Sequence, residues 1–137
     1  MITKLSVATI WVTDQNEALR FYTEKLGFEI RADVTNGTFR WLTVGLKSQP
    51  DLEFQLAGLT VSQALTQEEV ENLTALVQAG KMGIGPWKTE DCQKTYEAFK
   101  SNGVEFIQAP TDRPYGIIEA IFKDNSGNIM VLSQDKS

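Results

Sequence analysis

The sequence predicts an α+β protein built from two tandem βαβββ modules. Three observations favour this fold. Short runs of residues alternate between apolar and polar at period two, which is typical of strands packed on one face. Two helical segments with capping residues each follow such a run. The spacing of these caps, stops and strands in the first half of the chain recurs in the second half.

The first module opens with a strand, a helix and a second strand. Residues 10–13 alternate as in a strand, and Asp14 then occupies an N-cap position. Glu17 follows three residues later, so each of these two side chains can accept a hydrogen bond from a free backbone N–H of the first turn. Apolar residues at spacings of three and four predict a helix that ends at a left-handed Gly27. This stripe consists of Ala18, Leu19, Tyr22 and Leu26.

Three more strands complete the first module. A strand is predicted over 28–34, and Asn36-Gly37 predicts a two-residue hairpin turn because both residues tolerate positive φ. The chain returns as a strand over 38–44 and is interrupted over 45–50. Residues 51–56, DLEFQL, alternate as a fourth strand.

A connecting helix is predicted over about 66–79, after a loop over 57–64. Thr66 and Glu69 form a capping box, and Gly80 marks the end. Val70, Leu73 and Val77 lie on one face of this helix.

The second module repeats the first. A short strand over 84–89 precedes a helical stripe that stops at Gly103, and a strand over 104–107 follows. An offset of 76 residues pairs Trp11 with Trp87 and makes Glu90 the cap, whereas an offset of 77 pairs Tyr22 with Phe99 and makes Asp91 the cap. Both registers are open at this point.

The end of the second module contains two further strands. Residues 109–115 read as a proline-bearing loop, 116–122 as a strand and 128–133 as the last strand, with a turn at 124–127 between them. Such an arrangement matches the end of the first module and indicates an internal duplication.

Composition restricts the classes of protein to consider. The length of 137 residues fits one domain. A net charge of -5 disfavours binding to the negatively charged phosphates of nucleic acids. No apolar run is long enough for a membrane span. With Cys92 as the one cysteine and no signal peptide, we expect a cytoplasmic protein. The sequence contains no histidine, which removes the commonest general base and the commonest nitrogen ligand for metals.

Two motifs carry a resemblance to a known superfamily. They are D-x-x-x-A-x-x-F-Y-x-x-x-L-G-F at Asp14 to Phe28 and Y-G…F-x-D-x-x-G-N at Tyr115 to Asn128. The chain resembles the vicinal oxygen chelate superfamily of glyoxalase I, bleomycin-resistance proteins and extradiol dioxygenases. The resemblance covers roughly 5–134, with module one at about 5–57 and module two at about 83–134 of a single domain. It implies modules whose sheets curl around a central cleft, and it implies a homodimer.

Metal enzymes of that superfamily place four ligands on the first and last strands of each module. Carried over to this chain, these positions fall on Val7, Glu53, Ile84 (or Gly83 in the other register) and Val131. Among these positions only Glu53 has a side chain that can bind a metal, whereas catalytic metal sites ordinarily supply about three protein ligands. We therefore expect no metal and no other cofactor.

Strand alternation and the resemblance together give a set of expected cleft residues. Alternation assigns Trp11, Glu53, Gln55 and Val131 to the cleft, with Lys88 or Trp87 by register. An apolar, aromatic pocket with a few polar groups is usual for small-molecule sites, and a carboxylate facing tryptophans favours a planar cation. The expected ligand-binding residues are Trp11, Trp41, Glu53, Gln55, Lys88, Tyr115, Glu119 and Val131.

For several of these residues a purely structural role also remains open. Trp11 and Trp41 are as readily core or interface residues as ligand contacts. Glu119 and Arg113 are candidates for the mouth of a cleft, but a surface ion pair is the default interpretation of such residues. For Cys92, near the start of a helix, we expect a small buried side chain rather than a thiolate.

The favoured function is metal-free binding of a small, aromatic or cationic organic molecule, as in the bleomycin-resistance branch that the chain resembles. The alternative is a glyoxalase- or lyase-like enzyme that uses Glu53 as a base or as part of a degenerate metal site. A third interpretation is an interaction module whose cleft is filled by its own side chains.

Overall fold

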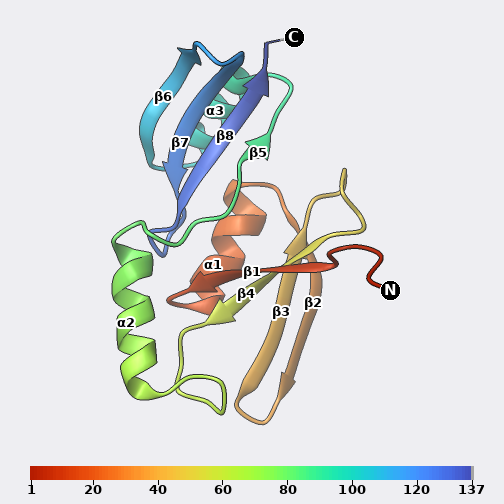
Figure 1. Cartoon of the computed structure of the whole chain (residues 1–137), viewed down its shortest axis with the longest axis vertical. Coiled ribbons are helices and arrows are strands. Elements are labelled where there is room, and N and C mark those ends of the chain that lie inside the picture. Colours follow the sequence, from red (N-terminus) through yellow and green to blue (C-terminus); the bar gives the residue numbers. More distant parts are fainter. Residues whose placement is uncertain (137) are drawn as a thin grey trace. The chain divides into compact units, whose positions relative to one another are not determined.

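The computed structural model describes residues 1–136 and divides into two compact units (Figure 1). Unit 1 covers Met1–Thr74, and unit 2 begins at Ala75. Each unit contains one four-stranded mixed sheet with a helix packed on it, and neither sheet closes into a barrel. This confirms the predicted α+β class and the βαβββ organisation of each half. No helix among residues 1–136 is long and apolar enough to cross a membrane.

The sheet of unit 1 has the strand order β1-β4-β3-β2. Strand β1 is parallel to β4, and the other neighbours are antiparallel. The parallel pair follows from the βαβββ order, because a helix and two strands separate β1 from β4 along the chain. The strands are β1 (Val7–Val12), β2 (Glu29–Asn36), β3 (Phe39–Gly45) and β4 (Glu53–Gly58).

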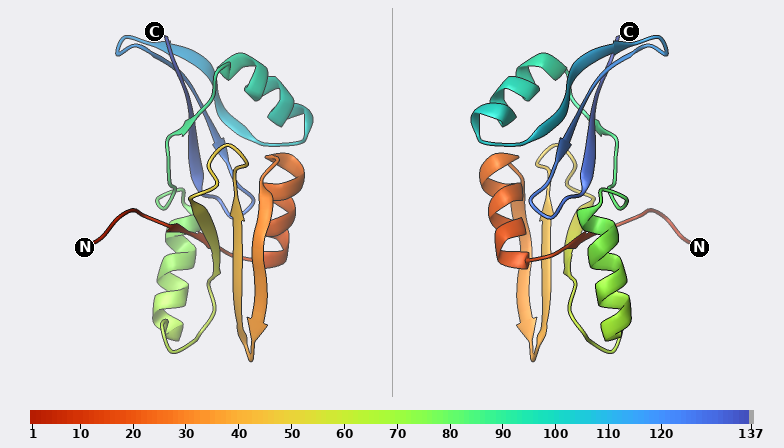
Figure 2. Two further views of the ribbon diagram at one scale, coloured as in Figure 1. Left: turned by 90° about the vertical axis from the view of Figure 1, so that its right-hand side faces the viewer. Right: turned by 90° about the vertical axis from the view of Figure 1, so that its left-hand side faces the viewer.

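One face of this sheet is covered by helix α1 (Gln15–Arg20), which continues as the π-helical turn η1 (Phe21–Lys25) (Figure 2). Asp14 caps α1 by accepting a hydrogen bond from the Glu17 backbone N–H at 2.9 Å. The predicted capping box also has the Glu17 side chain accept a hydrogen bond from the Asp14 backbone N–H. In the structure the Glu17 carboxylate pairs with Arg20 instead. The core between helix and sheet is apolar and includes Ile10, Val12, Ala18, Phe21, Tyr22, Leu42, Val44, Phe54 and Leu56.

The sheet of unit 2 repeats this design with the order β5-β8-β7-β6. Strand β5 is parallel to β8, while β8, β7 and β6 are antiparallel neighbours. Helix α3 (Cys92–Ser101) packs on one face (Figure 2), over a core that includes Val104, Ala120, Phe122, Met130 and Leu132. The strands are β5 (Trp87–Lys88), β6 (Phe106–Arg113), β7 (Ile117–Lys123) and β8 (Ile129–Asp135).

The cap of α3 decides the register between the two halves. The Asp91 carboxylate accepts a hydrogen bond from the Lys94 backbone N–H at 3.0 Å, and Asp91 has the extended backbone of an N-cap residue. Asp91 therefore corresponds to Asp14 at an offset of 77, and Glu90 is not the cap. In this register the position equivalent to Val7 is Ile84.

Helix α2 (Gln67–Gln78) is the predicted connecting helix. Its capping box is complete, because the Thr66 hydroxyl accepts from the Glu69 N–H at 3.2 Å while the Glu69 carboxylate accepts from the Thr66 N–H at 2.8 Å. Val77 is fully buried on the expected apolar face.

Two local predictions are wrong. Residues 109–115 were expected to form a loop, but β6 runs through Pro110 to Arg113, with its register irregular between Gln108 and Thr111. A proline is tolerated there because β6 is an edge strand whose outer N–H groups need no partner. In the first hairpin the turn residues are Gly37 and Thr38, since Asn36 still pairs with Phe39. Gly37 has a φ of +66°, which its missing Cβ permits.

Candidate functional site

The open face of the unit 1 sheet, which we define as the face opposite α1, carries four of the predicted site residues. Pairing in the sheet places Trp11 beside Ala57 and Gln55 between Thr9 and Thr43. Trp41 lies beside Val34. Since neighbours in register project to the same side, the face has an aromatic end at the tryptophans and a polar end at Gln55 and Glu53.

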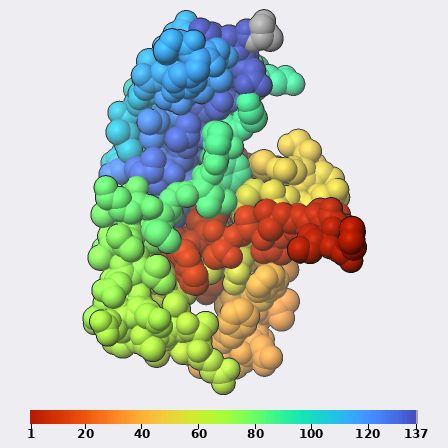
Figure 3. Space-filling model, in the orientation of Figure 1, coloured from red at the N-terminus to blue at the C-terminus, as the bar shows by residue number. Residues whose placement is uncertain are grey.

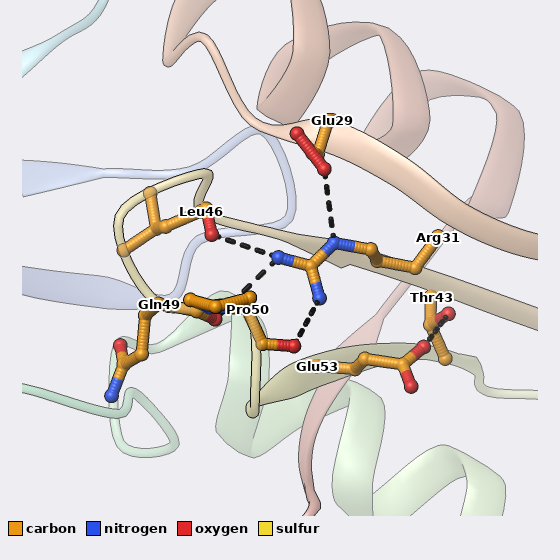
Figure 4. A network of polar contacts seen from close by, with 7 residues as sticks. All are labelled: Glu29, Arg31, Thr43, Leu46, Gln49, Pro50 and Glu53. Carbon is orange, nitrogen blue, oxygen red and sulfur yellow. Dashed lines mark hydrogen bonds and ion pairs between the residues drawn. The ribbon is translucent and has the colours of Figure 1, made fainter.

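Glu53 is fixed at the polar end by a neighbour that sequence reasoning missed. The hydroxyl of Thr43 donates to Glu53 Oε1 at 2.7 Å, and Thr43 is fully buried (Figure 4). No cation joins this carboxylate in the ion pairs of residues 1–136. The half-buried Glu53 is therefore oriented by a hydrogen bond and keeps acceptor capacity for a ligand or for a proton. The only signal for Thr43 in the sequence was its spacing of two from Trp41.

Arg31 holds the loop that leads into Glu53. Its guanidinium donates to the carbonyl oxygens of Leu46 at 2.8 Å and Pro50 at 3.1 Å, and it pairs with Glu29 at 3.3 Å (Figure 4). The guanidinium occupies the space above Gly45, where an added Cβ would lie 2.5 Å from Arg31 Cζ. Arg31 thus crosslinks the β3–β4 loop at the residues just before β4, and this fixes the start of the strand that carries Glu53.

Unit 2 contains a pocket with a volume of about 310 Å³ on the side of its sheet opposite α3. Its walls are formed by the segment 80–86, which precedes β5, and by residues of β7 and β8. Figure 3 shows the segment, green to teal, at the surface of unit 2. Most of the side chains that line the pocket are aliphatic. The lining residues are Gly80, Lys81, Gly83, Ile84, Gly85, Pro86, Ile117, Glu119, Ile129, Val131 and Ser133.

Glycines let the segment 80–86 lie close to β8. A Cβ on Gly83 would stand 1.9 Å from the carbonyl oxygen of Ile129, so no other residue fits at this point. One wall of the pocket therefore combines glycine backbone with the side chains of Lys81, Ile84 and Pro86, while the side chains of β7 and β8 form the other.

Glu119 is the one carboxylate in the lining of this pocket, and its side chain is only 14% exposed. Arg113 Nε donates to Glu119 Oε1 at 2.8 Å, and the Tyr115 hydroxyl donates to the same oxygen at 3.2 Å. Gln108 accepts from Arg113 at 2.8 Å and donates to the backbone carbonyl of Glu119 at 3.3 Å. This closed set of hydrogen bonds holds the carboxylate in one position.

Of the other predicted residues of unit 2, some lie at the pocket and others lie outside it. Val131 lines the pocket. Tyr115 is 64% exposed in the β6–β7 turn and reaches the pocket through its bond to Glu119. Lys88 lies outside the lining, pairs with Asp135 at 2.6 Å and is exposed. Trp87 is in register with the buried Leu132, so it belongs to the α3 side of the sheet.

Cys92 is fully buried, at the first residue of α3. Burial raises the pKa of its thiol, and the nearby carboxylates of Asp91 and Glu119 raise it further. The residue is therefore a neutral thiol at neutral pH, and it fits the small buried side chain that the sequence predicted.

The four superfamily metal positions do not fit a divalent ion. Val7 and Glu53 are neighbours across β1 and β4, and Ile84 and Val131 line the pocket of unit 2. Three of these four side chains are aliphatic and have no donor atom, and Glu53 already accepts from Thr43. Within residues 1–136 no three His, Cys, Asp or Glu side chains gather as a metal site would require.

Comparison with known proteins identifies the family. The model of the glyoxalase/bleomycin resistance protein/dioxygenase superfamily matches residues 4–132. The chain belongs to this superfamily. The match spans nearly the whole chain, so both βαβββ units are part of the family domain.

Two solved structures and one curated relative resemble the chain over nearly its full length. The crystal structure of UcmS2 is 42% identical and covers 100% of both chains, with a TM-score of 0.92. TnmS3, an antibiotic binding protein from Streptomyces sp. CB03234, is 25% identical over 98% of this chain and 97% of its own, with a TM-score of 0.75. YurT of Bacillus subtilis (strain 168), an uncharacterized protein, is 34% identical over 96% of this chain and 98% of its own.

Proposed function

We propose that this protein binds a small organic molecule without the help of a metal. The observation that carries the proposal is the pocket of unit 2, which combines aliphatic walls with one held carboxylate, Glu119. Its volume of about 310 Å³ lies at the lower end of the range for small-molecule sites. Few convergent polar groups in an apolar surrounding are what such sites use to orient a ligand.

All of the predicted residues except Lys88, which pairs with Asp135 outside the pocket, have a role in this proposal. In unit 2, Val131 forms part of the apolar wall, and Glu119 and Tyr115 provide polar contacts. The open face of unit 1 is a separate surface of this proposal. Trp11 and Trp41 stack on flat rings there, because tryptophans offer large apolar area with little loss of entropy. Glu53 and Gln55 contact polar groups of a molecule bound on that face.

The family gives independent support. TnmS3 is an antibiotic binding protein, and the present chain matches it over nearly its full length. The donor set at the metal positions also favours binding without an ion, since three of the four side chains there are aliphatic.

Titration of the intrinsic tryptophan fluorescence with a panel of aromatic antibiotics tests the proposal. We expect at least one compound to bind at about micromolar affinity or tighter, roughly 8 kcal/mol. Val131→Phe fills the pocket and should weaken binding about tenfold or more, as expected when a ligand loses its apolar contacts. Val61→Phe is the matched control, because Val61 is 58% exposed and lies outside the pocket. The proposal would be contradicted if no compound of the panel showed saturable binding.

The second candidate function is an enzyme that uses Glu53, whose carboxylate is oriented by the hydrogen bond from Thr43, as a base. Compounds that bind are incubated with the protein and analysed by mass spectrometry. Our proposal expects the compounds to be recovered unchanged, and it expects Glu53→Ala to lower affinity only. Conversion that disappears in Glu53→Ala would establish the enzyme instead.

A further inference from the structure

The charges around the unit 2 pocket define the kind of ligand it takes, on the assumption that the proposed function holds. Glu119 contributes a negative charge to the lining and Lys81 a positive one. Arg113 adds a second positive charge through its bond to Glu119 at 2.8 Å. The carboxylate is thus already neutralised, and the sum of these charges gives no attraction for a cation.

The two oxygens of Glu119 are used differently. Both the Arg113 and the Tyr115 hydrogen bonds end on Oε1. Within residues 1–136, Oε2 accepts no hydrogen bond, and this atom is not among the fully buried polar atoms without a partner. Oε2 is therefore not sealed off and keeps acceptor capacity, on a residue that lines the pocket.

The hydrogen bonds around Glu119 also fix its direction. Gln108 accepts from Arg113 and donates to the backbone carbonyl of Glu119, so it helps to hold the guanidinium in place beside the carboxylate. A carboxylate held in this way acts as a preorganised acceptor, and preorganisation reduces the cost of binding. Ser133, the partner of Glu119 across β7 and β8, adds a hydroxyl beside it.

We infer that the unit 2 pocket selects a neutral, largely apolar molecule that donates one hydroxyl or N–H group to Glu119 Oε2. Ile84, Ile117, Ile129 and Val131 supply apolar contact around the molecule. A ligand without the donor binds more weakly, because it covers a charged acceptor that then gives up water without gaining a hydrogen-bond partner. A cationic ligand gains nothing, because Arg113 already pairs with the carboxylate.

Three probes that share a naphthalene ring and differ in one substituent test this inference. They are 2-naphthol, 2-methoxynaphthalene and 2-naphthylmethylammonium. Affinities are measured by NMR titration of protein with ¹³C-labelled isoleucine methyl groups, which locates the probe at Ile84, Ile117 and Ile129. We expect 2-naphthol to bind about tenfold more tightly than the ether, which corresponds to one hydrogen bond to a charged group. The ammonium probe should bind no more tightly than 2-naphthol.

Two variants assign the preference to Glu119. Glu119→Gln should reduce the preference for 2-naphthol over the ether to about threefold or less, since a neutral amide is the weaker acceptor. Glu105→Gln makes the same change at an exposed carboxylate outside the pocket and should keep the full preference. If Glu119→Gln is poorly folded, Val131→Phe replaces it and should abolish the isoleucine shifts with 2-naphthol and with the ether.

The outcomes separate this inference from the proposed function. Equal affinities for 2-naphthol and the ether, tighter binding of the ammonium probe, or shifts at isoleucines outside the pocket would overturn the inference. If the antibiotic panel still binds, the proposed function survives that result. The absence of binding by every probe and by the panel would overturn both.

Discussion

Cys92 shows how its surroundings determine the chemistry of a single residue. Its thiol lies at the start of a helix, a place that lowers thiol pKa values in reactive cysteines. Here burial and the carboxylates of Asp91 and Glu119 raise the pKa instead. Desolvation is the largest of these causes, so the helix terminus does not produce a thiolate.

We therefore predict that native protein does not react with Ellman's reagent at about pH 8, where an ordinary thiol with a pKa of about 8.5 reacts readily. Full reaction should follow in guanidinium chloride. The raised pKa also means that the folded state holds its proton more tightly than the unfolded state. The resulting stabilisation is present below about pH 8.5 and is lost as the pH rises through the folded pKa.

A Cys92→Ala variant lacks this titration and serves as the control. Its free energy of unfolding should fall less than that of the parent protein between about pH 8 and pH 10. Rapid modification of the native thiol, or identical pH profiles of the two proteins, would contradict the assignment.

At the residue scale, the sequence predicted positions better than partners. Alternation placed Glu53 on the side of β4 opposite the buried Phe54 and Leu56, and the structure agrees. It could not show that Thr43 donates to Glu53 or that Arg31 crosslinks the adjacent loop. These contacts depend on which strands are neighbours and on the path of a loop, and neither follows from periodicity.

At the element scale, the segment 80–86 depends most on one residue. We predict that Gly83→Ala destabilises the protein by about 2 kcal/mol or more, because the added Cβ would meet the Ile129 carbonyl, and backbone atoms cannot move aside cheaply. The variant should also bind pocket ligands more weakly, since this wall of the pocket must shift. Urea denaturation measures the first effect and fluorescence titration the second.

Gly58→Ala is the matched control for that substitution. Its added Cβ would lie 3.3 Å from the nearest atoms, which belong to the Gln15 side chain rather than to the backbone, and we expect a change in unfolding free energy below about 1 kcal/mol. If Gly83→Ala and Gly58→Ala lower the unfolding free energy equally, the close approach of Gly83 to the Ile129 carbonyl is not the reason that this position requires glycine.

Elements with capping residues were predicted well, and elements without them were not. Asp14 and Thr66 lie at the expected helix starts, and Asp91 is one of the two starts that the sequence left open for the third helix. The π-helical turn at Phe21–Lys25 left no sign, because its apolar residues also fit an α-helix. Pro110 misled the prediction of β6, since proline breaks a central strand but is tolerated at an edge.

At the scale of the whole molecule, the donor set of the chain gives a prediction about metals. Calorimetric titration of metal-stripped protein with Zn²⁺, Ni²⁺, Mn²⁺ and Fe²⁺ should reveal no stoichiometric site of about micromolar affinity, because the superfamily positions offer one carboxylate and three aliphatic side chains. Ligand binding should be unchanged by EDTA. A tight stoichiometric site would overturn metal-free binding and direct attention to enzyme substrates.

The homodimer implied by the superfamily resemblance stays a prediction for the molecule as a whole. Sedimentation equilibrium over a range of concentrations would measure its mass directly. A mass equal to that of one chain at all concentrations would contradict it.

The pocket wall at 80–86 has a consequence for how this protein could change its ligand. Because glycine and proline contribute little side-chain volume on that side, the apolar side chains that set the size of the pocket are Ile84 in the segment and Ile117, Ile129 and Val131 on the opposite strands. These side chains are half-buried rather than part of the tightly packed core. Selection can therefore widen or narrow the binding space through four positions while the fold of unit 2 is preserved, which makes them the natural targets for redesigning its specificity.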